Sequence, residues 1–448
     1  MKKFLVVLLS LGLILAFGMT ASAADVKFSG GYYLSGVYWD NPTVADNNGY
    51  SRAFFYQRFR LQPVFNIAEG LTFTTRMDAL EKQWGNVTWK GGYSDEPLSR
   101  KVTPQGGAEP TRGAQENFEF ERAYVTFKTG IGLFQVGYQG ADEWGTAFAD
   151  NGTTRPRILY ALPLGPLTLT AVYEKYYESD TAAGLTVANA RRQDSDYDTY
   201  ALAGIGKFTG GEAGLLLKYY ADHSKSVAIL GGYKTDVYLV SPYMKATFGP
   251  VYVEAEVDYF GGTVREFVSG AADIDQSSID AYVMAKVKLG PANVGGLFAY
   301  STGDDGTDPS KSKTSPAGAG TSWNPALLLM NDDLNTWSGG TGTTTNPAGV
   351  TSRKQNIMLV QAFGDFNPTP KLNLGASLTW AKVNEKKTFV DDKLGTEFDV
   401  TATYKIYDNL SYMVGAGYLL TGDYFKGASA AKEVGNDYML LNKLTLSF

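Results

Sequence analysis

The stretch that decides the fold reads V-Y-V-E-A-E-V-D-Y-F and runs from Val251 to Phe260. Every second residue from Val251 onward is apolar, and the residues between include Glu254, Glu256 and Asp258. Successive side chains of a β-strand point to opposite faces of the sheet. The alternation therefore predicts a strand with one apolar face and one charged face.

The same alternation recurs at 281–289, 372–380 and 398–406. A soluble β-sandwich also alternates, so the turns have to distinguish the two architectures. Tight turn signals fall at eight places: 68–70, 129–130, 164–166, 209–211, 249–250, 290–291, 367–370 and 407–409. Nine longer polar connections alternate with them, near 40–51, 84–115, 141–153, 180–195, 222–232, 262–277, 303–352, 384–393 and 423–436.

Short turns on one side and long loops on the other are typical of a transmembrane antiparallel up-and-down β-barrel. The seventeen connections predict eighteen strands. Sixteen is the alternative count, because 155–162 and 196–207 are weakly patterned. Aromatic residues near the predicted strand ends are candidates for the interfacial girdles of such a barrel: Tyr38, Trp39, Phe127, Tyr173, Phe248, Tyr259, Phe366, Trp380 and Tyr404.

The N-terminus has the features of a cleaved secretory signal. Lys2 and Lys3 precede an apolar run over 4–19, and the small residues 21–23 follow it. We therefore expect a signal peptide over residues 1–23 and a barrel over 24–448. Removal of the signal takes away two of the 40 basic residues and none of the 46 acidic ones, which leaves a formal net charge of −8. This acidity gives no indication of a nucleic-acid partner.

The chain has no cysteine and one histidine. The missing cysteines exclude disulfides, thiol nucleophiles and a C-x-x-C-H haem site. Acidic loop segments at 46–49 and 304–308 do not match the spacing of a calcium loop. The sequence therefore predicts no cofactor and no metal.

In such a barrel, the faces opposite the apolar stripes line the lumen. Charged residues of both signs are predicted there: Arg58, Arg60, Arg76, Asp78, Glu119, Glu121, Arg122, Lys175, Lys218, Lys245, Glu254, Glu256, Asp258, Lys286, Glu397, Asp399 and Lys405. So many charges need water or partners, and a barrel of 16 to 18 strands encloses an aqueous channel. The charges could form a selectivity filter or a salt-bridged wall. A two-residue turn at Gly249-Pro250 sets Lys245 opposite Glu254, which favours the wall for that pair.

The largest insertion, 303–352, has an apolar core over 323–330, W-N-P-A-L-L-L-M. This core predicts that part of the loop folds into the barrel mouth or over it. Its candidate constricting residues are Trp323, Asn324, Leu328 and Met330. The rival for a constricting role is loop 84–115, which follows the third predicted strand. A flexible surface loop is the remaining alternative.

With these features over almost its whole length, the chain resembles bacterial outer-membrane porins. The segment 121–125 with 136–138 looks like paired strands of such porins, and Phe448, which closes an alternating strand, resembles the signal that the barrel-assembly machinery recognises. The resemblance implies an outer-membrane location in contact with lipid, passive diffusion of small hydrophilic solutes or ions, and possible homotrimers. Residues 300–305 and 323–325 are similar to alginate-export-like barrels, which would imply a path for an anionic polysaccharide. The acidic chain does not favour that alternative.

Barrels of this kind can also serve functions other than a pore. An outer-membrane hydrolase would need a histidine near a serine, and the only histidine is His223, between Asp222 and Ser224. We therefore do not expect an enzyme. A TonB-dependent receptor would carry a plug domain before its first strand, whereas the first strand here begins close to Ala24. An adhesin barrel or a sheath for partner proteins stays open.

Overall fold

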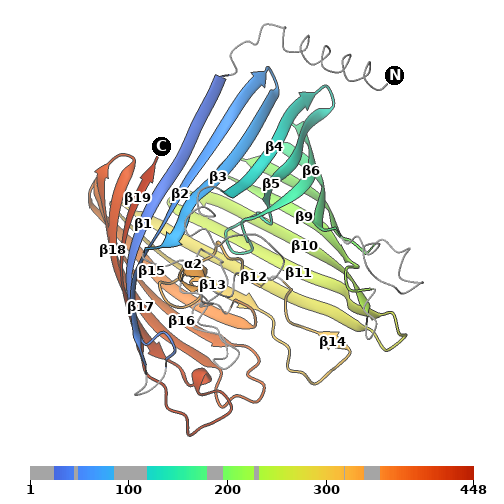
Figure 1. Cartoon of the computed structure of the whole chain (residues 1–448). Coiled ribbons are helices and arrows are strands. Elements are labelled where there is room, and N and C mark those ends of the chain that lie inside the picture. Colours follow the sequence, from blue (N-terminus) through green and yellow to red (C-terminus); the bar gives the residue numbers. More distant parts are fainter. Residues whose placement is uncertain are drawn as a thin grey trace, which may run out of the picture.

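The computed structural model describes residues 25–44, 49–84, 119–178, 195–226, 232–316, 318–337 and 354–448. These residues form a closed antiparallel β-barrel of eighteen strands (Figure 1). The predicted signal peptide lies outside the described residues. The barrel strands are β1 Asp25–Asp40, β2 Ser51–Ala68, β3 Leu71–Gln83, β4 Glu119–Thr129, β5 Gly132–Ala141, β6 Thr153–Leu164, β7 Leu167–Tyr177, β8 Tyr197–Phe208, β9 Gly211–Asp222, β10 Tyr233–Phe248, β11 Val251–Phe267, β12 Ile274–Leu289, β13 Ala292–Ser301, β15 Ile357–Thr369, β16 Leu372–Val383, β17 Lys393–Tyr407, β18 Leu410–Thr421 and β19 Asp437–Ser447.

The barrel closes where β1 pairs with β19. The ladder between them runs from Gly31 opposite Ser447 to Asp40 opposite Tyr438. Each of the eighteen strands thus has two neighbours, which satisfies the backbone donors and acceptors that lipid cannot. The two-residue strand β14 (Lys311–Ser312) pairs with the loop-side end of β12 and takes no part in closure. Two short helices, α2 (Asp332–Trp337) and η3 (Asp423–Lys426), lie in the loops.

The connections confirm the sequence prediction. All eight predicted tight turns join consecutive strands, and the nine long connections alternate with them. The short turns lie toward the top of Figure 1 and the long loops toward the bottom. The strand count is eighteen and not sixteen, because both weakly patterned segments form strands, β6 and β8. At the β10–β11 turn, Gly249 has a φ of 59°, which glycine adopts without steric cost, and Lys245 lies opposite Glu254 as predicted.

The barrel wall has apolar side chains on its outer face and charged side chains on its inner face, which is the reverse of a soluble protein. Val257 and Val400 are 41% and 57% exposed on the outside, whereas Glu256 and Asp258 are 1% and 2% exposed on the inside. The free energy of a valine or leucine side chain is about 1.5–3 kcal/mol less favourable in water than in an apolar medium. This outer surface therefore matches lipid.

The predicted aromatic girdle needs one correction. Phe248, Phe366 and Tyr404 are exposed near strand ends, as a girdle requires. Trp39 is instead fully buried, and its Nε1 donates to both carboxylate oxygens of Asp437, at 2.9 and 2.8 Å. It braces the seam between β1 and β19 rather than facing lipid.

In the part of the chain that the structure describes, none of the helices has the length and apolar character needed to cross a membrane.

Substituting Val400 by lysine places a charge on the outward face near the middle of β17. We expect Val400→Lys to lower the free energy of unfolding in lipid by about 2–4 kcal/mol. Thr401→Lys, one residue away on the inner face, is the control and should cost clearly less. Equal losses in denaturant titrations of the two variants in lipid vesicles would contradict the assignment of the faces.

Candidate functional site: the barrel interior

Two loops fold into the barrel. One is the β5–β6 connection, residues 142–152, and the other is the described part of the β13–β15 connection, which carries α2 into the interior (Figure 1). For the second loop, the sequence left a fold into the barrel mouth, a lid over it and a flexible surface loop as alternatives, and it gave no prediction of an inward fold for the first loop. Most of the rival loop 84–115 lies outside the described residues.

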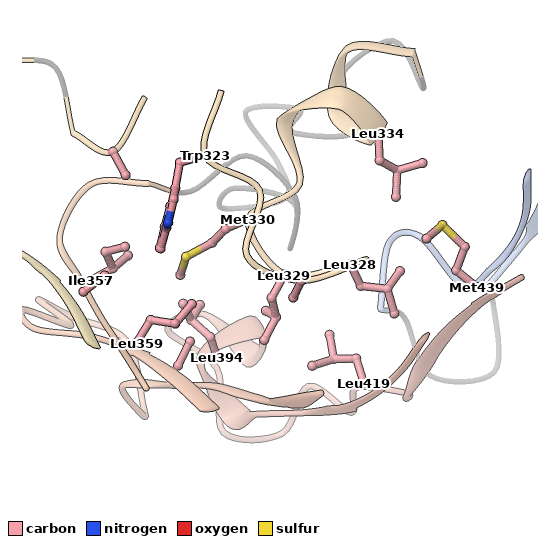
Figure 2. Packing of buried hydrophobic residues seen from close by; sticks show 14 of the residues in the cluster. Trp323, Leu328, Leu329, Met330, Leu334, Ile357, Leu359, Leu394, Leu419 and Met439 are labelled. Carbon is pink, nitrogen blue, oxygen red and sulfur yellow. The ribbon is translucent and has the colours of Figure 1, made fainter. Parts of the chain in front are cut away.

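The second loop is held partly by apolar packing. Leu328, Leu329 and Met330 are buried, and together with Trp323 they pack against wall residues of β15, β17, β18 and β19 (Figure 2). Figure 2 shows the wall residues Ile357, Leu359, Leu394, Leu419 and Met439. Burial of each large side chain contributes about 1.5–3 kcal/mol. The apolar run that singled out this loop in the sequence is thus what attaches it to the wall.

Two wall carboxylates bind the backbone of the same loop. Glu397 accepts hydrogen bonds from the N–H groups of Leu328 and Leu329, both at 2.7 Å. Asp399 accepts from the Leu327 N–H at 3.4 Å and from the Ser377 hydroxyl at 3.0 Å. A carboxylate buried away from water requires such donors. Glu397 and Asp399, predicted to line the pore, therefore lie beneath the loop in this conformation.

Further polar contacts fix the loop on either side of its apolar core. Asn331 caps α2, since its Oδ1 accepts from the Leu334 N–H at 2.9 Å. The buried ammonium of Lys354 donates to the carbonyls of Gly320 and Trp323, at 2.7 and 2.6 Å. Burial lowers the pKa of Lys354 to about 8. The loop is held along its length and not only at its tip.

The first loop attaches to a different part of the wall. Its Thr146 N–H donates to Glu256 at 2.6 Å, and the Trp144 indole donates to the Ser241 carbonyl at 3.0 Å. Gly145, between them, has a φ of 62°, and a Cβ there would come within 2.8 Å of the Glu256 carboxylate. The positive φ favours glycine, and any side chain there would also displace the Glu256 carboxylate. Glu256, like Glu397, is therefore covered by a loop that it anchors.

The two loops also bind each other. Phe148 stacks on Tyr282 at 5.1 Å and meets the edge of Trp323 at 5.3 Å. Gly320 N–H donates to the Phe148 carbonyl at 2.6 Å, and Ser322 N–H to the Asp150 carbonyl at 2.9 Å. Trp144 and Phe148, two large aromatic residues in an otherwise small and polar loop, were the signal that could have revealed the inward fold from the sequence.

A polar cavity of about 830 Å³ lies beside the loops, and we name it the inner chamber. Its wall comes from β1 to β4 and β19, and its other side from the two loops. Its charged lining residues are Arg58, Arg60, Arg76, Glu81, Glu119, Glu121, Glu143, Asp332, Asp333 and Lys443. Five residues of the predicted pore lining, Arg58, Arg60, Arg76, Glu119 and Glu121, are among them.

The arginines of the inner chamber are neutralised by neighbouring acids. Arg60 binds Asp78 at 2.6 Å and Glu121 at 3.1 Å, Arg76 also binds Glu121, and Arg58 lies 3.4 Å from Glu81. The described lining holds six acidic and four basic side chains, so an acidic excess faces the chamber. Asp78, Glu81 and Glu121 could bring oxygens within 4.8 Å of one another around a cation, but these ion pairs already use them. Arg122 pairs with Glu143 of the first loop at 3.0 Å.

A second cavity of about 340 Å³, the outer chamber, lies at the loop-side ends of β6 to β11. Its lining includes Arg155 and the rings of Tyr176, Tyr197, Tyr220 and Phe260. The Arg155 guanidinium lies 4.0 Å above the Tyr176 ring, at cation–π distance. Beside this chamber, Lys218 is buried and binds Glu174 at 2.7 Å and Asp142 at 3.1 Å.

The remaining predicted lining residues are spread along the wall. Glu254 accepts from the hydroxyls of Tyr252 and Tyr282, at 2.8 and 2.9 Å, and forms no ion pair with Lys245 within the described residues. Lys286 lies 5.0 Å above the Tyr252 ring. Lys175 pairs with Asp198 at 3.2 Å, and Lys405 is exposed near the turn-side end of β17.

The geometry around His223 does not resemble a catalytic triad. Its Nε2 lies 3.3 Å from Asp236 Oδ1, and the Ser224 hydroxyl donates to Asp222 at 2.5 Å. Among the described residues, no serine hydroxyl hydrogen-bonds to the imidazole. The acids of loop 304–308 bind backbone and hydroxyl groups of their own loop.

Replacing Glu397 by glutamine tests the loop anchor. Glutamine offers one carbonyl acceptor, so one of the two N–H bonds is lost together with the charge. We expect Glu397→Gln to weaken docking of residues 326–330 by about 1–3 kcal/mol, which is roughly tenfold to hundredfold faster hydrogen exchange there. Glu385→Gln, at an exposed loop acid, is the matched control. Unchanged exchange in Glu397→Gln would show that the Glu397 hydrogen bonds do not hold the loop.

The fold has counterparts among solved structures. No protein-family model matches the sequence, and no curated protein matches it either. Two crystal structures of the outer membrane protein OpdK from Pseudomonas aeruginosa, one with vanillate, are similar to this chain at 13% identity and a TM-score of 0.50, covering 94% of this chain and 99% of theirs. OccK8 (OprE) of the same organism is similar at 13% identity and a TM-score of 0.51, covering 94% and 98%. The chain therefore shares its fold with these Pseudomonas outer-membrane barrels.

Proposed function

We propose that this protein is a porin of the outer membrane, a water-filled channel for the passive diffusion of small hydrophilic solutes or ions. The observation that carries the proposal is the inner chamber, a polar space of about 830 Å³ inside a closed barrel with an apolar outer surface. Charged walls of this kind require water. The barrel supplies the passage through lipid, and the two inward loops set its width.

Conductance of the purified, refolded protein in a planar bilayer tests the pore directly. Removing residues 321–337 takes away the apolar core and α2 of the second loop. We expect steady single-channel conductance from the full chain and a severalfold larger conductance from the shortened one, because the removed residues lie inside the barrel. A full chain and a shortened chain that both stay closed would contradict the porin proposal and favour an adhesin or a sheath for partner proteins.

The acidic excess of the inner chamber supports cation preference. Glu119 is exposed in its lining, and one unit charge at about 6 Å in water is worth about 0.7 kcal/mol, roughly threefold in local cation concentration. Removing the charge lowers the local cation concentration and raises the local anion concentration by the same factor, so we expect Glu119→Gln to reduce the cation-to-anion permeability ratio about tenfold in reversal potentials under a salt gradient. Asp308→Asn, at an exposed loop acid, is the control. Anion preference in the unaltered protein would contradict this part of the proposal.

The same charge balance disfavours the anionic polysaccharide of the alginate-export-like alternative.

The sequence also suggests two partners of the proposed porin: recognition of Phe448 by the barrel-assembly machinery and association into homotrimers. For the first, the Phe448 N–H and carbonyl pair with Gly30 across the barrel seam, at 3.1 and 2.8 Å. Lipid-facing apolar strands supply the surface that the second would use.

A further inference from the structure

The outer face of β6 to β10 is not evenly covered by large side chains. Ala171 of β7 lies between Tyr160 of β6 and Leu202 of β8 in the ladder. One step closer to the turns, Gly204 of β8 lies beside Leu169 of β7. Both small residues are on the lipid-facing side, since Leu202 and Leu169 are exposed there. The outer surface is therefore low at two neighbouring positions.

Two adjoining hollows lie over these positions, with volumes of about 640 and 400 Å³. They share four lining residues: Tyr160, Ala171, Leu202 and Leu217. Because of this shared lining, the two hollows form one continuous depression, which we name the apolar groove.

A row of tyrosines marks the loop-side end of the apolar groove. Tyr173, Tyr200, Tyr219 and Tyr238 stand side by side on β7, β8, β9 and β10. The Tyr173 hydroxyl donates to Asp198, nearer the loops, at 3.0 Å. Tyrosines with an apolar ring and a polar tip are typical of the membrane interface. The long loops of such barrels face outside, so the groove runs from the outer interface into the outer leaflet.

The lining of the apolar groove suits an apolar ligand. Among the described residues that line it, Lys218 is the only charged one, and its ammonium points into the barrel, where it binds Glu174 at 2.7 Å. Lipid tails are as apolar as leucine side chains, so van der Waals contact and not the hydrophobic effect would favour a ligand here. A chain lying in the groove contacts protein below and on both sides, which increases the number of such contacts.

We propose that the apolar groove binds one hydrocarbon chain of an outer-leaflet lipid, which stays with the protein while neighbouring lipids exchange. The groove is continuous with the lipid-facing surface of the barrel, so lipid chains already surround it. A second copy of the barrel would present a broad convex wall that bridges the hollow. A flexible chain can instead follow its floor from Ala171 to Gly204. The site does not depend on the proposed pore.

Lipid that remains bound through purification tests the site. The protein is reconstituted in phosphatidylcholine vesicles in which part of the lipid carries a photoreactive diazirine in one acyl chain. It is then transferred to detergent, freed of unbound lipid and illuminated. We expect label on Leu202 and Leu217 and none on Phe398 and Val400, which are also exposed, on β17. Protein without label, or label spread evenly around the barrel, would overturn the proposal.

Filling the floor of the groove provides a second test. Ala171→Phe adds a ring at the floor. At Gly204 an added Cβ would meet Leu169 Cδ2 at 3.5 Å, an ordinary contact, so Gly204→Leu is a second filled variant. Each should reduce the label on Leu217 severalfold. Ala402→Phe, at an outward alanine of β17 on the other side of the barrel (Figure 1), is the matched control and should keep the label. Undiminished label in the filled variants would contradict the site.

Illumination in the intact vesicles distinguishes a lipid chain from a second copy of the barrel. With a lipid chain in the groove, Leu202 and Leu217 take up label in the vesicles as well as in detergent. If these two residues stayed unlabelled in vesicles while Val400 was labelled, another barrel would be covering them, and the proposal would be wrong.

Discussion

The absence of hydrogen-bond partners in lipid is the constraint on which this structure depends. It requires each strand to have two neighbours, and the β1–β19 ladder completes that requirement. In the closed barrel, the alternation of residues along each strand determines which side chains face outward and which face inward. Apolar residues such as Val257 and Val400 face outward, and acids such as Glu256 and Glu397 are placed inside with nowhere to meet bulk water except the lumen.

The interior acids then acquire a structural use. Glu397 and Asp399 hold the second loop through its backbone N–H groups, and Glu256 holds the first loop in the same way. Backbone N–H groups of an inward loop would otherwise be unsatisfied, as would the carboxylates, so each satisfies the other. The two loops meet at Asn151 and Thr321, and these two residues line both the outer and the inner chamber. The same acidic residues thus supply the charge of the inner wall and hold the loops that narrow the lumen.

Much of the fold could be predicted from the sequence, because strand periodicity and turn chemistry are local properties. The eight turns, the nine loops and the opposition of Lys245 and Glu254 all follow from residues close in the chain. Whether each interior charge is covered by a loop or exposed to the lumen could not be predicted in the same way. Glu256 and Glu397 share the pattern of Glu119, yet a loop from a distant part of the chain covers the first two and leaves Glu119 exposed. Trp39 likewise has the sequence position expected of an interfacial residue. In the structure it is buried and binds Asp437, which is nearly 400 positions away in the chain.

The central claim is that the inner chamber is the conducting path, and a cysteine placed in its wall tests it most directly. Thr445 lines the chamber on β19, and its neighbour Leu446 lies on the opposite face of the same strand. A charged thiol reagent added to single channels should change the conductance of Thr445→Cys in discrete steps and leave Leu446→Cys unaffected. An open Thr445→Cys channel that does not respond to the reagent would contradict the account, because ions would then have to pass through some space other than this chamber.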